Sequence, residues 1–278
     1  MSHALDRQRK IEQLVNEKGI VKVTELSGHF GVTEATIRHD LAKLQAENRI
    51  IRKHGAAVSI RFMQSEPGEM TGVLGYGTVV REAAVAQFPE RMMMYAREKE
   101  EIAREAVGLI EPFDRIAMDA SSTTFYVARL LPPDLPVTVL THSLQVMLEL
   151  QKKPKVEVIA TGGILSRDTQ SLIGPLSERT IGRYNVNKAF ISCMGIDFQY
   201  GITEQSELQM LVKRKMIEMA EKVYLLAEHS KFGSKNFTYL AAFEQIELIV
   251  TDAGLAEEHR TEMDRLGIRY RLAGQVAS

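Results

Sequence analysis

The residues best suited to chemistry in this sequence are hydroxyl side chains that stand where short apolar segments end. One group follows the strand-like run Arg115–Asp119 and opens a helical pattern; it consists of Asp119, Ser121, Ser122, Thr123 and Thr124. Hydroxyl groups and free backbone amides at the N-terminus of a helix form a natural cradle for phosphate. The alternative is that Ser122 or Thr123 only caps the helix.

Two further apolar runs end in the same manner. Val137–Thr141 leads into His142-Ser143, and Val156–Thr161 leads into Gly162-Gly163, where the backbone lets a ligand approach closely. Ligands of parallel sheets bind beyond the carboxyl ends of the strands, so the three segment ends predict one phosphate site. Lys231 offers a counter-charge, or it only caps a carbonyl group. The predicted effector contacts are Asp119, Ser121, Ser122, Thr123, Thr124, Thr141, His142, Ser143, Gly162, Gly163 and Lys231.

A second kind of chemistry is indicated by residues 33–58. Ile37, Leu41 and Leu44 recur at helical spacing, which predicts a helix with one buried stripe. Thr33 is a suitable N-cap, and Glu34 lies in the first turn, where the helix dipole favours an acid. The opposite face carries hydrogen-bond donors of different reach, namely Thr36, Arg38, His39 and Lys43.

A basic hairpin follows this helix. Ile50-Ile51 predicts a short strand, and Arg52-Lys53-His54-Gly55 predicts its basic tip. A polar helix followed by such a hairpin suits insertion into the major groove of DNA, with a wing on the backbone. The predicted DNA contacts are Thr33, Glu34, Thr36, Arg38, His39, Lys43, Arg52, Lys53, His54 and Gly55.

Individual roles at the DNA follow from side-chain chemistry. The planar fork of Arg38 suits guanine O6 and N7. Phosphate contacts that fix the register are expected from Thr33, Thr36, Lys53 and His54. Asp40 is costly near phosphates, so we expect it to orient Arg38 or the wing. The alternative reading of this region is a three-helix domain that binds another protein.

The elements that must position these residues form two sets. The first 58 residues read as helix, short strand, helix, tight turn, helix and two-stranded wing, which is a winged helix-turn-helix. In this set the run Ile20–Val23 is the strand that can pair with the wing, and Thr24 is the expected cap of the second helix. The Gly-rich stretch 59–90 shows no lasting period and predicts a flexible connector.

From residue 91 to 278, helical patterns alternate with short apolar runs. This alternation predicts a mainly parallel α/β sheet with both faces covered. Strands are expected at Arg115–Asp119, Val137–Thr141, Val156–Thr161, Ala189–Cys193, Val223–Ala227 and Leu248–Asp252, and helices at Lys99–Ile110, Thr123–Leu131, Leu144–Leu150 and Ser206–Ala220.

Composition narrows the class of protein. The only cysteine, Cys193, excludes an intrachain disulfide and is expected to be buried, and no metal site or cofactor is predicted. No apolar run approaches the roughly 20 residues that span a bilayer, and the first ten residues are polar and charged, so a cytoplasmic protein is expected. Residues 1–60 hold ten Lys or Arg against seven acids, while the whole chain carries −1. A basic N-terminal part (residues 1–58, called the head) on an acidic remainder (residues 91–278, called the body) is compatible with a nucleic-acid partner.

The head resembles the N-terminal domain of DeoR-family bacterial transcription regulators. The family pattern Val-Ser-x-x-Thr-Ile-Arg-Arg-Asp-Leu, closing in Arg-x-His-Gly-Gly-Ala, is matched at Thr36, Ile37, Arg38, Asp40, Leu41, Arg52, His54, Gly55 and Ala57. The sequence departs from it at Thr33, His39 and Ala56. An imidazole is largely uncharged at neutral pH, so His39 weakens one expected contact.

The resemblance extends through the body. The family's sensor motifs correspond here to Asp119–Thr124, Thr141-His142-Ser143, Gly162-Gly163, Glu228–Gly233 and Thr251-Asp252. Family membership implies a fold similar to ribose-5-phosphate isomerase and glucosamine-6-phosphate deaminase, and a phosphorylated sugar or polyol as effector. The departures Ser121, His142 and Glu228 lie in the expected pocket and leave the identity of the effector open.

The leading hypothesis is a repressor of a sugar or polyol catabolic operon that releases double-stranded operator DNA when a phosphorylated sugar binds. One head makes few base contacts, so a homodimer or homotetramer is expected. The alternative is a sugar-phosphate isomerase or deaminase that carries a DNA-binding head. Such catalysis needs a carboxylate and a second acid or base, for which Asp119, Glu204, Glu228 and Lys231 are candidates.

Overall fold

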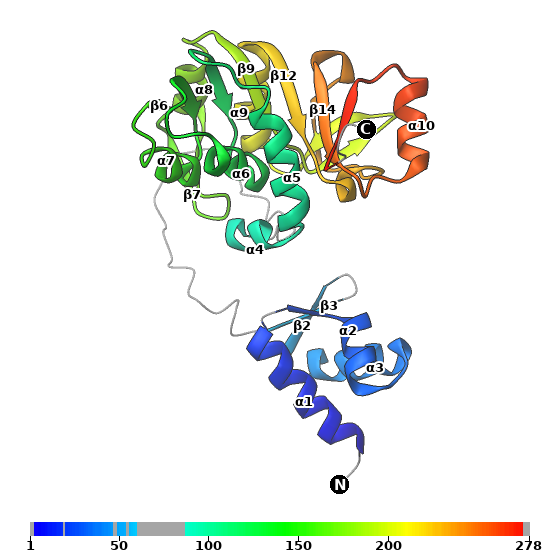
Figure 1. The fold of residues 1–278 in the computed structure, drawn as a ribbon. Coiled ribbons are helices and arrows are strands. Elements are labelled where there is room, and N and C mark those ends of the chain that lie inside the picture. Colours follow the sequence, from blue (N-terminus) through cyan, green and yellow to red (C-terminus); the bar gives the residue numbers. More distant parts are fainter. Residues whose placement is uncertain (1–2, 19, 47–48, 54–55, 60–86, 275–278) are drawn as a thin grey trace. The chain divides into compact units, whose positions relative to one another are not determined.

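The computed structural model describes residues 3–18, 20–46, 49–53, 56–59 and 87–274. They divide into two compact units, before and after residue 78 (Figure 1). Each unit has its own hydrophobic core. Most of the expected connector 59–90 lies outside the described residues. Regular structure begins within that range, because the helix α4 (Phe88–Met93) contributes the buried Phe88 to the second unit.

The first unit has the predicted order of elements. They are α1 (His3–Lys18), β1 (Ile20–Lys22), α2 (Val23–Phe30), α3 (Glu34–Ala46), β2 (Ile50–Lys53) and β3 (Ala56–Ser59). The strands form an antiparallel sheet in the order β1-β3-β2, with Lys22 and Lys53 both paired to Ala56. The expected pairing of the first strand with the wing is therefore confirmed. The expected cap at Thr24 is wrong: α2 begins at Val23, and its N-cap residue Lys22 makes no side-chain cap.

The second unit is built on a seven-stranded sheet in which every neighbouring pair is parallel, in the order β15-β14-β12-β9-β4-β5-β6. The predicted mainly parallel α/β sheet is thus confirmed. Its strands are β4 (Arg115–Met118), β5 (Val137–Thr141), β6 (Val156–Ala160), β9 (Val186–Ile191), β12 (Ala220–Leu226), β14 (Leu248–Asp252) and β15 (Tyr270–Ala273).

Helices cover both faces of this sheet (Figure 1). One face packs against α5 (Ala96–Val107), α6 (Ser122–Leu130) and α7 (Leu144–Leu150), and the other against α8 (Pro175–Ile181), α9 (Glu207–Glu218) and α10 (Glu257–Arg265). Smaller elements complete the unit: the hairpin β7 (Ile164–Ser166) and β8 (Ser171–Ile173), a second sheet of β10 (Gly195–Asp197), β11 (Gly201–Glu204) and β13 (Thr238–Ala241), and the 3-10 turns η1 (His229–Lys231) and η2 (Phe243–Gln245).

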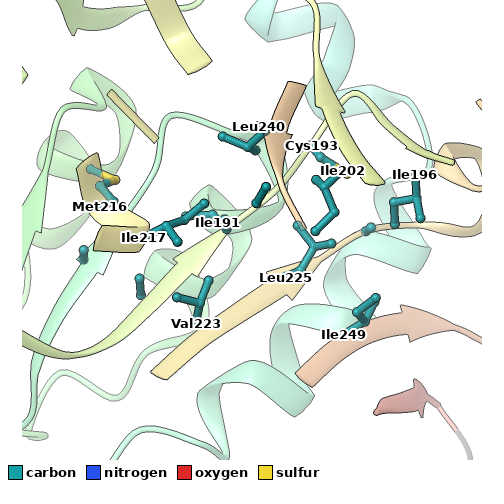
Figure 2. Close-up of a cluster of buried hydrophobic side chains, with 14 of the residues drawn as sticks. Ile191, Cys193, Ile196, Ile202, Met216, Ile217, Val223, Leu225, Leu240 and Ile249 are labelled. Atoms are coloured by element: carbon teal, nitrogen blue, oxygen red, sulfur yellow. The ribbon is translucent and has the colours of Figure 1, made fainter. Parts of the chain in front are cut away.

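The strands are apolar on both faces because successive side chains point to opposite sides of the sheet. Phe190 and Tyr224 stack at 5.1 Å on the α5–α7 side, while their neighbours Ile191 and Leu225 enter the core on the α8–α10 side. Figure 2 shows the latter core, which combines Met216 of α9 with residues of the main strands and of the small sheet in one cluster. Burying each such side chain contributes about 1.5–3 kcal/mol. The sheet is thus a rigid base for groups at its carboxyl edge.

Candidate functional site

The helix α3 presents the polar face that the sequence predicts. Arg38, His39 and Lys43 are exposed, and Ile37 on the opposite side is buried. The hydroxyl of Thr33 accepts a hydrogen bond from the Thr36 amide at 3.2 Å, so the predicted N-cap is confirmed.

Two of the predicted DNA contacts already form a pair on this face. The Arg38 guanidinium donates to the Glu34 carboxylate at 2.7 Å, one turn along the helix. Both side chains are exposed or half-exposed, so this pair is screened by water and is readily exchanged for a nucleic-acid contact.

The turn before α3 fixes its start. Gly31 adopts a left-handed conformation with φ 63°, which a side chain at this position would strain. Beyond it, the Val32 amide donates to the Ser27 carbonyl at 3.2 Å, and the Ser27 hydroxyl donates to the Val32 carbonyl at 2.6 Å. These bonds hold α2 and α3 as one helix-turn-helix.

Asp40 does not have the role expected for it. Its side chain is 1% exposed and accepts hydrogen bonds from Arg7 Nε at 2.6 Å and from Gln8 Nε2 at 2.8 Å. The expectation that it orients Arg38 or the wing is therefore wrong, because the carboxylate faces α1 inside the head. Asp40 fastens the first helix to α3.

The wing carries the remaining predicted DNA contacts. Arg52 pairs in the β2–β3 ladder with Ala57, and Lys53 pairs with Ala56. The predicted contacts His54 and Gly55 lie outside the described residues. The wing strands and α3 belong to the same small core, so the two candidate contact surfaces are held together.

In the second unit, a pocket of about 250 Å³ opens at the carboxyl ends of β4, β9 and β12. It is lined by Arg91, Met94, Tyr95, Lys99, Ser121, Ser122, Thr123, Ser192, Cys193, Met194, Gln205, Lys213, Glu228, Ser230 and Lys231. Among the predicted effector contacts, the structure thus brings Ser121, Ser122, Thr123 and Lys231 together around one cavity.

The start of α6 forms one side of this pocket. Ser121 is the N-cap, and its hydroxyl accepts from the Thr124 amide at 3.1 Å. The caps foreseen as the alternative, Ser122 and Thr123, are the first helical residues and line the cavity instead. First-turn amides point toward a bound anion, which the helix dipole also favours. This side of the pocket is suited to a phosphate group.

The floor of the pocket is a buried ion cluster. Lys213 Nζ donates to Glu204 at 2.5 Å and to the Ser192 carbonyl at 2.9 Å, and it lies 3.2 Å from the Asp119 carboxylate. The predicted contacts Asp119 and Thr124 belong to this floor, since the Thr124 hydroxyl donates to Asp119 at 2.8 Å.

Electrostatics keep the floor charged. Burial by itself would raise the pKa of Asp119, but the charge of Lys213 and the hydrogen bonds from Ser192 and Ser121 hold that pKa below its usual value. Burial would likewise lower the pKa of Lys213, and the charges of Glu204 and Asp119 raise it instead. The three groups bind one another, and because two carboxylates share one ammonium the cluster also attracts the Arg91 guanidinium.

Three further cations, Arg91, Lys99 and Lys231, line the pocket. Lys99 Nζ donates to the carbonyls of Arg91 and Met94, at 2.5 Å and 2.6 Å, and burial lowers its pKa to about 8. Lys231 follows β12 in η1. The guanidinium of Arg91 differs from both, because its buried Nε and one terminal nitrogen have no hydrogen-bond partner.

The predicted effector contacts Thr141, His142 and Ser143 are buried but are not among the residues that line the pocket. Thr141 donates to the Met118 carbonyl at 2.8 Å, and Ser143 caps α7. His142 Nε2 lies 3.3 Å from the Gln209 side-chain oxygen, and burial lowers the His142 pKa to about 4, so its ring is neutral.

The predicted contacts Gly162 and Gly163 have positive φ and lie beside β8 and α8. A Cβ on Gly163 would come within 2.6 Å of the Ile173 carbonyl oxygen. This glycine is required for the packing of the hairpin, and that packing accounts for it without a ligand.

Several pocket residues were missing from the sequence prediction, chiefly Arg91, Lys99 and Lys213. Lys213 carried a usable signal, since it lies on the apolar face of its helix with Met210 and Ile217, where a lysine needs a partner. Arg91 in α4 and Lys99 in α5 precede β4, the first strand of the main sheet, and they belong to no sequence motif.

Among the described residues, no group of three or more His, Cys, Asp or Glu side chains is placed to hold a metal ion. Burial raises the pKa of the Cys193 thiol to about 12, so this side chain is a neutral part of the pocket wall. No helix in the described part of the chain is long and apolar enough to cross a membrane.

Comparison with known proteins agrees with both units. Residues 7–62 match the DeoR-like helix-turn-helix domain, and residues 95–253 match the DeoR C terminal sensor domain. The ribose 5-phosphate isomerase A of Methanocaldococcus jannaschii aligns with 50% of this chain and 55% of its own, at 16% identity and a TM-score of 0.37.

Whole-length relatives are regulators of transcription. An uncharacterized HTH-type transcriptional regulator, YulB of Bacillus subtilis, is 40% identical over 250 residues, covering 90% of this chain and 89% of its own. The L-fucose operon activator of Haemophilus influenzae is 37% identical and covers 90% and 93%. The transcriptional repressor GlcR of Bacillus subtilis is 32% identical and covers 88% and 86%. The chain therefore belongs to the DeoR family of transcriptional regulators.

Proposed function

We propose that this protein represses a sugar or polyol catabolic operon and is released from operator DNA by a phosphorylated sugar or polyol. The observation that carries the proposal is Arg91, whose buried guanidinium has unpartnered nitrogens in the pocket that the N-terminus of α6 lines. Buried N–H donors without acceptors are costly, and a phosphate dianion would supply acceptors to Arg91 Nε and to the terminal nitrogen that lacks one. The floor carboxylates Asp119 and Glu204 attract the Arg91 charge, but their close contacts are with Lys213 and they leave these two nitrogens without an acceptor.

The head makes the contacts with DNA. Residues 1–58 bind DNA through α3 and the wing, the stretch 59–90 connects, and residues 91–278 sense the effector. Because one head offers few base contacts, the active form is a homodimer or homotetramer that reads paired half-sites in the cytoplasm. The effector must bind the released state more tightly than the DNA-bound state, since equal affinity for both would shift nothing.

Fluorescence anisotropy tests this proposal on the full chain. The labelled DNA is the region upstream of the protein's own gene, and the titrants are phosphorylated sugars and polyols together with their unphosphorylated counterparts. Release by at least one phosphorylated compound, and by no unphosphorylated one, is expected. Tighter DNA binding with the compound would make the protein an effector-dependent co-repressor or activator. Failure to bind the DNA, or indifference to every compound, would overturn the proposal.

A second candidate is a sugar-phosphate isomerase or deaminase that carries a DNA-binding head. It is favoured by Glu228, whose buried Oε2 has no hydrogen-bond partner and is free to accept a proton in the pocket. The other candidate carboxylates, Asp119 and Glu204, are both engaged by Lys213. NMR of the same compounds incubated with the protein distinguishes the two, because only an enzyme converts a ligand that it binds.

A further inference from the structure

The helix α4 is the first described element of the second unit and follows the stretch of chain that leads to the head. It has only six residues, so contacts with other elements must hold it in place. Phe88 is buried beside the Phe125 ring of α6, and its amide donates to the Asp168 carbonyl, in the turn between β7 and β8, at 3.0 Å. The Tyr126 hydroxyl of α6 donates to the Met92 carbonyl at 3.1 Å. These contacts dock α4 against α6 and the β7–β8 turn.

The docked helix also determines which cations line the pocket. Arg91 belongs to α4, and its guanidinium reaches the cavity from there. Lys99 Nζ donates to the carbonyls of Arg91 and Met94 at the end of the same helix. The position of Arg91 in the pocket therefore depends on the docking of α4, and two carbonyls of this short segment hold the Lys99 ammonium.

Docking carries a cost within the protein itself. Arg91 Nε and one terminal nitrogen are buried, and no described residue accepts a hydrogen bond from them. Burial lowers the pKa of both Arg91 and Lys99, which means that it opposes their charged forms. The charges of Glu204 and Asp119 offset only part of this effect at Arg91. A short helix with such a cost opens readily, and an anion bound to Arg91 would stabilise its docked state.

We propose that α4 transmits the occupancy of the pocket: a phosphorylated effector holds α4 docked through Arg91, and the docked state is the one that releases DNA. The inference rests on the function proposed above and identifies the element whose state changes. An effector shifts an equilibrium only through its different affinities for two states. Docked and undocked α4 differ in this respect, because only the docked helix presents Arg91 to the phosphate. Tyr126 is a positioning residue, since it holds Met92 and is not among the residues that line the pocket.

Hydrogen–deuterium exchange of the full chain tests the docking of α4 directly. Mass spectrometry reads the peptides that cover residues 87–95. The probes are inorganic phosphate, with chloride at equal ionic strength as the blank, and each compound that releases DNA in the anisotropy assay. At a probe concentration of about ten times the dissociation constant, exchange in α4 should slow by up to roughly tenfold, because binding adds to the free energy of local opening.

Tyr126→Phe tests whether docking controls the response to the effector. The variant keeps the ring in the core and removes only the hydroxyl that binds the Met92 carbonyl. The compound concentration that releases half of the DNA should rise about two- to tenfold, because one neutral hydrogen bond no longer favours the docked state. DNA affinity without any compound should hold or rise. Tyr184→Phe is the matched control at a half-exposed tyrosine after α8, and it should respond like the wild type.

Phe88→Ala removes the buried anchor of α4 and gives the stronger form of the test. Exchange in residues 89–95 should be fast with and without phosphate, and release of DNA should be lost or need far more compound. If this variant does not fold, Tyr126→Phe still decides the matter.

Two results would overturn the inference alone: a compound that releases DNA while exchange in α4 is unchanged, or a Tyr126→Phe variant that releases DNA at the wild-type concentration. If no phosphorylated compound releases DNA from the wild type, the proposed function fails and the inference fails with it.

Discussion

Lys213 and Asp119 come from different elements, the helix α9 and the end of β4, yet the lysine Nζ lies 3.2 Å from the carboxylate and both side chains are buried. Glu204 binds the same ammonium at 2.5 Å, so one cation serves two acids. The cluster joins the main sheet, the small sheet and α9 directly beneath the pocket.

Removal of the cation should therefore destabilise the second unit. Lys213→Met leaves two buried carboxylates without their partner, which costs about 3–5 kcal/mol. Differential scanning calorimetry should show a lower transition temperature for this unit and an unchanged transition for the head. Lys222→Met, at an exposed position on β12, provides the comparison and should leave both transitions in place.

Arg91→Ala should separate binding from stability. Arg91 Nε and one terminal nitrogen are buried and make no hydrogen bond in the free protein, so the substitution relieves their desolvation and the melting temperature should hold or rise. A charge-assisted bond to phosphate is worth about 1.5–3 kcal/mol, and affinity for an active phosphorylated ligand should fall roughly 10- to 150-fold. Arg97→Ala serves as the control, because the Arg97 side chain is 87% exposed. Equal losses in both variants would place Arg91 outside the ligand contacts.

The buried Lys99 predicts opposite pH trends for ligand binding and for stability. Burial lowers its pKa from 10.5 to about 8, against the raising effect of Glu228. Above pH 8 the folded chain loses this charge, so phosphate affinity should fall by up to about tenfold by pH 9. Between pH 8 and 10.5 the unfolded chain holds more protons at this residue, so its contribution to stability rises with pH.

Calorimetric titrations at constant ionic strength check the first trend, and urea denaturation across the same pH range checks the second. In Lys99→Met the affinity should be low at pH 7 and nearly independent of pH up to 9. An affinity for the wild type that is equal at pH 7 and pH 9 would contradict the assignment.

On the head, Arg38→Ala should abolish specific DNA binding without unfolding. The guanidinium is 58% exposed, and its pair with Glu34 is worth only about 0.3–0.5 kcal/mol, so stability changes little. A lost bidentate base contact removes about 1–3 kcal/mol of discrimination in each head. Gel-shift titration against Arg9→Ala, an exposed arginine on α1 with the same charge, shows whether the loss is specific.

Asp40→Asn should have the opposite profile. The carboxylate that joins α1 to α3 becomes neutral and its bond from Arg7 weakens, which costs the head about 1–3 kcal/mol. The head transition in calorimetry should shift downward while the second unit is unaffected. At a temperature where the variant head remains folded, its operator affinity should equal that of the wild type. A large loss of affinity at that temperature would show that Asp40 takes part in DNA binding.

Much of the fold was predictable because its central strands are buried on both faces. β5 and β14 have the predicted bounds, since continuous apolar runs end sharply at polar residues. The edge strand β15 and the helix α10 were missed, because solvent-facing elements keep polar side chains such as Arg271. Cys193 is buried as predicted, but it is not part of the strand: β9 ends at Ile191, two residues before it.

The site was predictable only where it is local in sequence. Ser122 and Thr123 stand at the start of a helix after a strand, and that pattern alone places them. Arg91 and Lys99 reach the same cavity through the packing of α4 and α5, which depends on contacts distant in sequence. Asp40 was misjudged for a related reason, since its partners lie on the first helix.

The pocket draws its wall from both ends of a long stretch of chain, from Arg91 to Lys231. During synthesis the chain emerges from its N-terminus at about 5–20 residues per second, and units fold as they appear. A nascent chain can therefore complete its DNA-binding head while Lys231 is still to be translated. For that interval, the head exists before the wall of the pocket is complete.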